Sequence, residues 1–443
     1  MPWKKPAVKF RTDSGDKRCL FEVRPGVPLE DYSGPFRSDL RLTDFSRRQL
    51  ANMYNMVHQY HYVIMGAYMD HINKNYGYEA MCDARKFVWC RVMPKVAHDL
   101  NKQYVNIKGD SLEDFMKAWQ IDLNSMPGRY FDITFEMPDE NRGVVIINRC
   151  PVVEKYEASG QTDKIKQVCA SCPTAIENTA RIHDFDIEVA TLAQPPRRSK
   201  DHICCAFQVH IRPDLFDAAT KGVTIAEIDL KIDKSKKDKR LDLEVDPNAE
   251  LKDYSGPFKP DLKMTDFSRV QLAKLYSMAT EYDVLAMLGF QQWCLEHHGY
   301  EAMTNCANDV WGGRLPHTFV ELNAKYMNYK KPYDIETYMK HWQTDLTGMG
   351  PRYYSWEFQK VDKHHAIVLC NKCIAVEMME PLGAPELLHQ LCEKADIDCI
   401  RRTARIYDPD LDVKHHFIPP RENEDGGICC KWELFYESKG PLP

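Results

Sequence analysis

The sequence predicts an α+β protein made of two tandem homologous domains. The chain repeats itself, because Asp31–Ser46 and Asp253–Ser268 are identical at 12 of 16 positions, at an offset of 222. The offset persists within a few residues to Cys204-Cys205 and Cys429-Cys430. Such a period is far above the roughly 20–50 residues of solenoid repeats, so each copy is a whole domain. We place copy 1 at 7–212, a connector at 213–228 and copy 2 at 229–437.

Each copy is expected to begin with a hairpin and a helical half. Apolar and polar residues alternate around a polar turn at 9–23 and again at 231–245, which predicts a short β-hairpin in each copy. A long helix is predicted from Phe45 to Asn73, because apolar residues recur there near helical spacing after the capping pair Thr43-Asp44. Further helices are predicted over 78–100 and 111–123.

The second half of each copy changes to a strand pattern. In copy 1, 130–136 and 143–148 alternate or are β-branched around a polar turn, and 187–192 and 202–211 form a second such pair after a helix at 162–182. Copy 2 repeats the order, with hairpins near 353–370 and 411–436. Helices segregated from a four-stranded antiparallel sheet define an α+β domain. Two such domains in one chain predict a pseudo-dimer that replaces a two-fold homodimer, and further oligomerisation stays open.

The composition is that of a globular protein of two domains. Hydrophobic residues make up 44% of the chain and charged residues 28%, and the net charge is −6, so there is no basic footprint for nucleic acid. The chain lacks an apolar stretch long enough to span a membrane and an apolar segment near Met1 typical of a secretory signal. We therefore expect a cytoplasmic protein, in which the 16 cysteines bind metal, catalyse or pack rather than form disulfides.

Cysteine is the chemically active residue that both copies retain in matching places. Strand alternation places Cys205 and Cys430 on the apolar face of the last strand and Cys204 opposite. Thiolates from a strand end, a helix and a final strand can surround one zinc or iron ion, with sulfurs roughly 4 Å apart. The predicted metal ligands are Cys150, Cys169 and Cys205 in copy 1 and Cys373, Cys392 and Cys430 in copy 2. The alternative is that these thiols are inert core residues.

Two Cys-x-x-Cys pairs also occur, at Cys169–Cys172 and at Cys370–Cys373, in different places in the two copies. Cys150-Pro151, Cys169-Ala-Ser-Cys172 and Cys205-Ala206-Phe207 resemble the Cys-Pro … Cys … Cys-x-Phe pattern of the L-2-amino-thiazoline-4-carboxylic acid hydrolase-like family. From the Asp-Tyr-Ser-Gly-Pro-Phe phrase to the closing Ile-Cys-Cys, each copy is similar to an uncharacterised bacterial family, rich in anaerobes, related to that group. The resemblance implies hydrolytic opening of a thiazoline ring. Copy 2 departs from the pattern, since Ile374 replaces the proline.

The first long helix carries a second candidate group. Tyr54, His58 and His61 share one helical face with Met65, and the equivalent residues of copy 2 are Tyr276, Thr280, Asp283 and Met287. Histidine titrates near neutrality and tyrosine can donate to a developing oxyanion, so Tyr54, His58 and His61 are predicted catalytic residues. We expect the better-formed pocket in copy 1. The alternative is an amphipathic helix with polar groups at its border.

Retained tryptophans and arginines are predicted to bind substrate. Trp89 and Trp311 are equivalent residues of the second helices, and Arg129 and Arg352 lie where helix changes to strand. An arginine can hold a carboxylate bidentately beside an aromatic wall. The Asp-Tyr-Ser-Gly-Pro-Phe phrase, by contrast, predicts only a fixed turn.

The preferred interpretation is a metal- or thiol-dependent enzyme, a hydrolase or lyase that acts on a small organic acid or heterocycle. A thiolate-bound zinc or iron would polarise a carbonyl or imine, and an activated cysteine would attack it. Two alternatives belong to other classes: a metal-stabilised ligand-binding or assembly protein, and an iron–sulfur redox protein.

Overall fold

The structure is a computed structural model that describes residues 17–125, 130–211, 231–313, 315–346, 353–379, 388–389, 391–419 and 428–441. The chain divides into two compact units, each assembled from separate segments. Unit 1 contains 1–71, 279–284 and 294–443, and unit 2 contains 72–278 and 285–293. The 30-residue helices α1 (Arg47–Tyr76) and α8 (Arg269–His298) contribute residues to both units.

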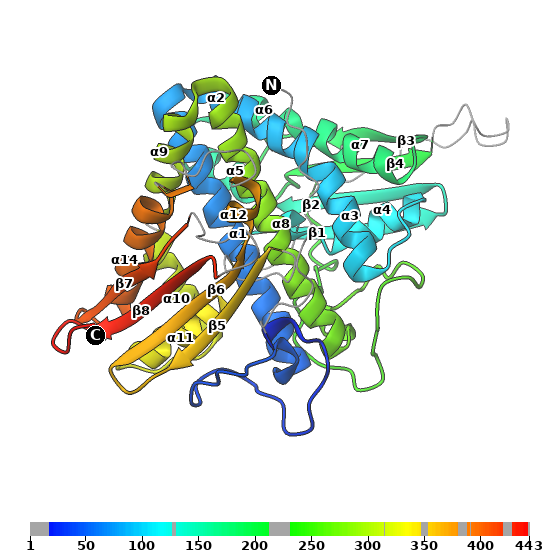
Figure 1. Cartoon of the computed structure of the whole chain (residues 1–443). Coiled ribbons are helices and arrows are strands. Elements are labelled where there is room, and N and C mark those ends of the chain that lie inside the picture. The colour runs from blue at the N-terminus through cyan, green and yellow to red at the C-terminus, as the bar shows by residue number, and fades with distance from the viewer. Residues whose placement is uncertain are drawn as a thin grey trace, which may run out of the picture. The chain divides into compact units, whose positions relative to one another are not determined.

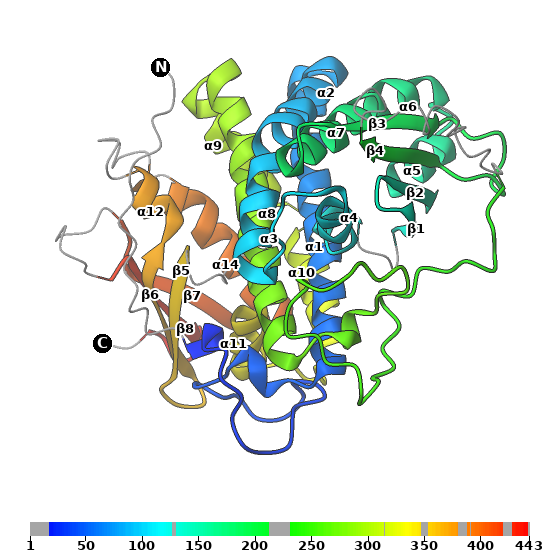
Figure 2. The ribbon, with the colours of Figure 1, turned by 90° about the vertical axis from the view of Figure 1, so that its right-hand side faces the viewer.

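Unit 2 contains a helical layer and one antiparallel sheet. The strands are β1 (Asp132–Asp139), β2 (Arg142–Arg149), β3 (Ile187–Ala193) and β4 (Cys205–Ile211), in the order β1-β2-β4-β3. The helices α4 and α7 lie beside this sheet (Figure 2). The helical segments are α2 (Tyr78–Lys86), the π-helical turn η3 (Phe87–Val92), α3 (Met93–Val105), α4 (Leu112–Gln120), α5 (Pro151–Ala158), α6 (Thr162–Cys169) and α7 (Ser171–His183).

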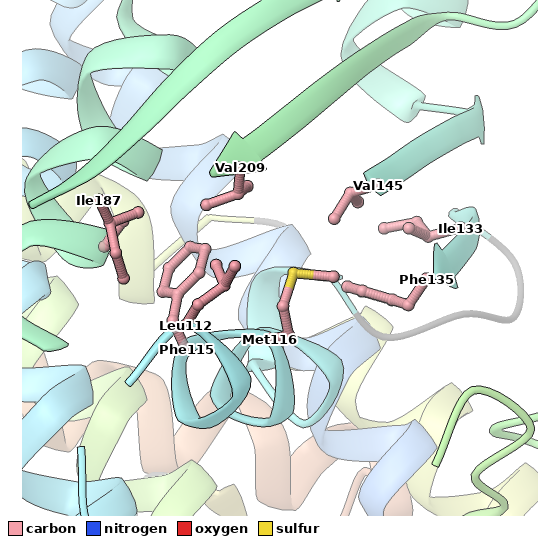
Figure 3. Close-up of a cluster of buried hydrophobic side chains, with 9 residues drawn as sticks. Leu112, Phe115, Met116, Ile133, Phe135, Val145, Ile187 and Val209 are labelled. Atoms are coloured by element: carbon pink, nitrogen blue, oxygen red, sulfur yellow. The ribbon is translucent and has the colours of Figure 1, made fainter. Parts of the chain in front are cut away.

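The apolar face of α4 closes the core of unit 2. Leu112, Phe115 and Met116 point from α4 toward the sheet, where Val145 and Val209 face them (Figure 3). All five side chains are buried, as the alternation of the strands and the helical spacing require. Gly143 of β2 lies against Met116, where a Cβ would come within 2.6 Å of its sulfur, so a larger residue would require the Met116 side chain to move.

Unit 1 repeats the same architecture with the helices and strands of copy 2. Its sheet has the order β5-β6-β8-β7, and α10 and α11 lie behind it in Figure 1. The strands are β5 (Tyr354–Lys360), β6 (His365–Cys373), β7 (Leu411–Phe417) and β8 (Cys430–Tyr436). The helical segments are α9 (Tyr300–Trp311), α10 (Leu315–Tyr326), α11 (Ile335–Thr344), α12 (Ile374–Met379), the π-helical turn η10 (Leu391–Asp396) and α14 (Ile397–Tyr407).

The predicted mixture of helices and antiparallel four-stranded sheets is confirmed, but several details differ. The predicted hairpin at 231–245 is wrong, because only Lys231 makes an isolated bridge, to His202. This segment buries only Arg240, and a two-stranded hairpin without a buried apolar face is unstable in water. The helix predicted over 78–100 is interrupted by η3, and α5 was not predicted. The first part of the hairpin predicted at 9–23 lies outside the described residues.

Each unit takes its amino-terminal segment and most of one long helix from one copy, and its shorter helices and its sheet from the other. In unit 1, the buried Tyr32 Oη donates to Gln343 Oε1 of α11 at 2.7 Å. In unit 2, the equivalent Tyr254 Oη donates to Gln120 Oε1 of α4 at 2.6 Å. The compact units and the sequence copies are therefore different divisions of the chain.

The same exchange repeats around each tyrosine. The Phe36 amide donates to Glu336 in unit 1 and the Phe258 amide to Glu113 in unit 2, both at 2.6 Å. A buried arginine completes each joint: Arg240 donates to the Gln120 carbonyl at 2.7 Å and stacks 4.8 Å from the Phe135 ring. In unit 1, the equivalent Arg18 donates to the Gln343 carbonyl and lies over the Phe358 ring. The phrase predicted to be only a turn is a docking segment.

We expect Tyr32→Phe and Tyr254→Phe each to lower the free energy of unfolding by about 1–3 kcal/mol, because each leaves a buried glutamine oxygen without its donor. Urea denaturation measures the change. The control is Val27→Thr, at a side chain that is 95% exposed, which should shift stability by less than about 0.5 kcal/mol. Tyrosine variants as stable as this control would contradict the docking role.

Candidate functional site

The predicted catalytic residues of α1 lie inside the core of unit 1. Tyr54, His58 and His61 are all essentially inaccessible to solvent. His61 Nδ1 lies 2.7 Å from Asp283 Oδ1, and the Tyr282 ring meets the His61 imidazole edge-on at 5.7 Å. Burial raises the pKa of the Asp283 carboxyl, while the hydrogen bond with His61 opposes the rise.

This contact corrects the expectation that His61 and Asp283 mark separate, copy-specific pockets. The two residues occupy the same position of the repeat, 222 residues apart, and they bind each other. A buried carboxylate needs a hydrogen-bonding partner, and the imidazole supplies one. Asp283 is fully buried rather than exposed, so the pair has the properties of a structural polar contact in a core.

The predicted substrate-binding residues are not gathered in one described site. Arg129 and Arg352 lie outside the described residues. Trp311 belongs to unit 1, where its ring lies 6.0 Å from Phe319. Trp89 belongs to unit 2 and is half-buried in the π-helical turn η3. Such π-helical turns often occur at functional sites, because they widen the helix and displace side chains from their usual spacing.

Unit 2 gathers the cysteines of copy 1 from four elements. Cys150 precedes α5, Cys169 ends α6, Cys172 begins α7, and Cys204 and Cys205 stand at the start of β4. Cys150 and Cys169 pack against a buried cluster that contains Cys204, Val153 and Ile165. Cys150 and Cys169 thus pack around Cys204, whereas the predicted metal set contained Cys205 in its place.

The order of burial at the Cys204-Cys205 pair is the reverse of the expected one. Cys204 is 1% exposed, whereas Cys205 is only partly buried. β4 begins at Cys205, so the strand alternation does not extend to Cys204, which instead turns under α5 and α6. In unit 1 both cysteines of the equivalent pair are buried, Cys429 at 0% and Cys430 at 8% exposure.

Within this thiol cluster, Cys172 is held by a cation. Arg85 of α2 donates from Nη2 to Cys172 Sγ at 3.3 Å, and its Nη1 donates to the Val168 carbonyl. Cys172 lies in the first turn of the 13-residue helix α7, whose N-terminal dipole also favours an anion. The neighbouring turn η3 approaches from the other side, where Cys90 Sγ lies 3.6 Å from the Ser171 carbonyl oxygen.

Cys169 completes the environment of Cys172. Its thiol donates a hydrogen bond to the Cys172 sulfur, and this bond, with the Arg85 guanidinium, lowers the pKa of Cys172 despite its desolvation. The donated proton correspondingly raises the pKa of Cys169. Burial raises the pKa of Cys150 to about 11 and that of Cys205 well above its usual value. Among the cysteines of this cluster, Cys172 is the one whose pKa is lowered, and the cause includes the contact with Arg85.

Sequence reasoning missed Cys172 and Arg85 as functional residues. The Cys169–Cys172 pair was visible, but its partner Arg85 is 87 residues distant along the chain. The repeat held a usable signal, because copy 2 has Ala307 at the position of Arg85 and Ala395 at that of Cys172. The two residues are thus present together in copy 1 and absent together from copy 2.

The cysteines of copy 2 form a more deeply buried group in unit 1. Cys370 pairs with Cys430 across β6 and β8, and Trp432 Nε1 donates to Cys430 Sγ at 3.1 Å. Burial raises the pKa of Cys370 and of Cys392 far above the usual value. None of the described contacts of this group places an arginine on a sulfur. The raised pKa values favour the thiol form at Cys370 and Cys392.

In the part of the chain that the structure describes, no three His, Cys, Asp or Glu side chains are arranged to hold a metal ion. The zinc or iron assignment to Cys150, Cys169, Cys205, Cys373, Cys392 and Cys430 therefore stays a prediction. Among the described helices, none has the length and apolar character needed to cross a bilayer.

Comparisons of the chain with family models, curated proteins and solved structures find no match. The resemblance to the thiazoline-carboxylate hydrolase-like family consequently stays a hypothesis.

The buried His61–Asp283 pair gives a stability prediction. His61→Ala and Asp283→Ala should each lower the free energy of unfolding by about 3–5 kcal/mol, because each leaves a buried polar partner uncompensated. The double variant should be less destabilised than the sum by about 0.5–3 kcal/mol. Urea denaturation of the three variants measures this coupling.

The matched control is the His71–Asp309 pair, which is 3.0 Å apart but has its carboxylate side chain 59% exposed. Solvent screens that pair, so its coupling should be at most about 1 kcal/mol. Equal couplings for the two pairs would show that burial does not govern the His61–Asp283 contact.

Proposed function

We propose that the chain is a thiol-dependent enzyme whose nucleophile is the Cys172 thiolate. The observation that carries the proposal is the Arg85 guanidinium, which donates to Cys172 Sγ at 3.3 Å while the Cys169 thiol contacts the same sulfur. A thiolate, not a thiol, is the reactive form of cysteine, and a neighbouring cation stabilises it. Cys172 is also partly exposed, so a small molecule can reach it.

The surroundings of Cys172 suit covalent catalysis on a small molecule. The sulfur would attack an electrophilic centre of the substrate, and the half-buried Arg85 would offer its remaining N–H groups to an anion that develops there. Trp89 lies next to Cys90 in the turn that contacts Ser171, so it is the described aromatic residue best placed to border a ligand. Hydrolytic or lytic action on a small organic acid or heterocycle stays the predicted outcome.

Copy 2 supports the proposal by contrast. Ala307 and Ala395 replace the cation and the nucleophile, and the cysteines that remain, among them Cys370 and Cys430, are buried. A role in packing alone would not require Arg85 and Cys172 to occur together in one copy. The proposed function therefore assigns the chemistry to unit 2 and a scaffold role to the equivalent part of unit 1.

The test is the pH dependence of alkylation by iodoacetamide, followed at each cysteine by peptide mass mapping. Because the pKa of Cys172 is lowered, its thiolate persists as the pH falls below the usual cysteine pKa. Its alkylation rate should thus change little between about pH 6 and pH 8, whereas an ordinary thiol slows about tenfold per pH unit. Arg85→Met should restore the ordinary pH dependence at Cys172.

The matched control is Arg91→Met, because Arg91 is exposed in the neighbouring turn η3 and makes none of the described contacts with Cys172. It should leave the Cys172 profile unchanged. A Cys172 rate that rises about tenfold per pH unit in the unmodified chain would overturn the assignment of the nucleophile.

A further inference from the structure

The Cys172 site contains a second thiol in a position to react with the first. Cys169 ends α6 and Cys172 lies in the first turn of α7, with Ala170 as the residue between the two helices. The two positions are three residues apart across the junction of α6 and α7, and both residues are partly exposed. The Val168 carbonyl, which precedes Cys169, is bound by the same arginine that contacts Cys172 Sγ. Arg85 therefore fixes both ends of the Cys-x-x-Cys segment.

We propose that Cys172 and Cys169 act as an attacking and a resolving thiol, so that the substrate class of this site is a disulfide. The inference rests on the proposed function, because it requires Cys172 to be the nucleophile. It adds that the electrophilic atom is sulfur and that the product state of the protein is a Cys169–Cys172 disulfide.

The chemistry balances in two exchange steps. In the first, the Cys172 thiolate attacks one sulfur of a substrate R–S–S–R′, a mixed disulfide forms, and R′–S⁻ leaves and takes a proton from water. In the second, the Cys169 sulfur attacks Cys172 Sγ, R–S⁻ leaves, and the Cys169 proton passes to it. The substrate gains two electrons and the protein loses two. An external low-molecular-weight dithiol then reduces the protein disulfide and completes the cycle.

The environment of each thiol fits its step. Arg85 and the helix terminus favour Cys172 as the initial thiolate and as the leaving sulfur when the protein disulfide is reduced. The described hydrogen bonds of Arg85 reach Cys172 Sγ and the Val168 carbonyl but not Cys169 Sγ, so Cys172 is the attacking thiol and Cys169 the resolving one. Cys150 and Cys205 are further thiols of the cluster, but neither is linked to Cys172 by a short, two-residue connection.

Unit 1 contains an internal control for thiol proximity alone. Cys294 and Cys306 also share a hydrogen bond between their thiols, but both are fully buried. Among their described contacts there is no arginine. If proximity were sufficient for exchange, this pair would oxidise as readily as Cys169 and Cys172. If access and the Arg85 contact matter, it stays reduced while the chain is folded.

The experiment adds a stoichiometric amount of dithiodipyridine, an aromatic disulfide whose reduction is followed by absorbance, to the reduced full-length protein. We expect two thiopyridone molecules per protein in quick succession and a peptide map with a Cys169–Cys172 disulfide. In Cys169→Ser, one thiopyridone should be released and the mixed disulfide should persist on Cys172. Cys19→Ser, at a partly exposed cysteine of unit 1, should react like the unmodified chain, and Cys294–Cys306 should stay reduced.

The outcomes separate the two proposals. A mixed disulfide that persists on Cys172 of the unmodified chain, or a disulfide with Cys150 in its place, overturns the resolving role of Cys169 and leaves Cys172 as the nucleophile. A Cys172 that reacts no faster than the other accessible thiols overturns both proposals. The map of the unmodified chain decides the inference even if Cys169→Ser does not fold.

Discussion

The hydrogen bond between a buried tyrosine and a buried glutamine is the contact on which both units depend. Tyr32 binds Gln343 in unit 1, and Tyr254 binds Gln120 in unit 2. Each bond joins the amino-terminal segment of one copy to a helix of the other, and that helix carries the apolar face that covers a sheet. Each glutamine also donates to a carbonyl of the docked segment, at Arg37 or Lys259, so the amide is satisfied from both sides. If the docked segment were lost, the glutamine amide would lose both of its hydrogen-bonding partners at a buried position.

This constraint separates what the copies must share from what they are free to change. Both copies keep the docked tyrosine, the glutamine and the buried arginine, Arg18 or Arg240. Each unit needs all three to hold its amino-terminal segment against the helix. The connection between the helices that follow the second strand takes no part in the described docking contacts. There copy 1 has Cys172 and copy 2 has Ala395, and the partner position changes from Arg85 to Ala307. A common scaffold thus leaves one pair of positions open to a change of chemistry.

The sequence predicted what depends on neighbouring residues and failed where distant residues meet. Helical spacing gave α1, and alternation gave the strand pairs of both sheets, since both periods are local. The docking of an amino-terminal segment onto a distant helix produces no helical or strand periodicity in the sequence. The Asp-Tyr-Ser-Gly-Pro-Phe phrase was therefore interpreted as a turn. The convergence of Cys150 and Cys169 followed from element order, but the Arg85 contact depends on how α2 packs against the α6–α7 connection. Alternation also misplaced Cys204, because it lies just before the strand.

The His61–Asp283 contact shows what a tandem chain permits that a homodimer does not. The two residues occupy one position of the repeat, and they are in contact with each other. In a dimer of identical chains the pair would be two histidines or two aspartates. Two buried carboxylates would repel, and one would have to be protonated. Two imidazoles would lack a carboxylate acceptor. A fused chain can place an imidazole in one copy and a carboxyl group in the other, so that Asp283 Oδ1 finds a hydrogen-bonding partner at a buried position. The predicted pseudo-dimer stays a prediction, and the contact between equivalent positions 61 and 283 is the observation that bears on it.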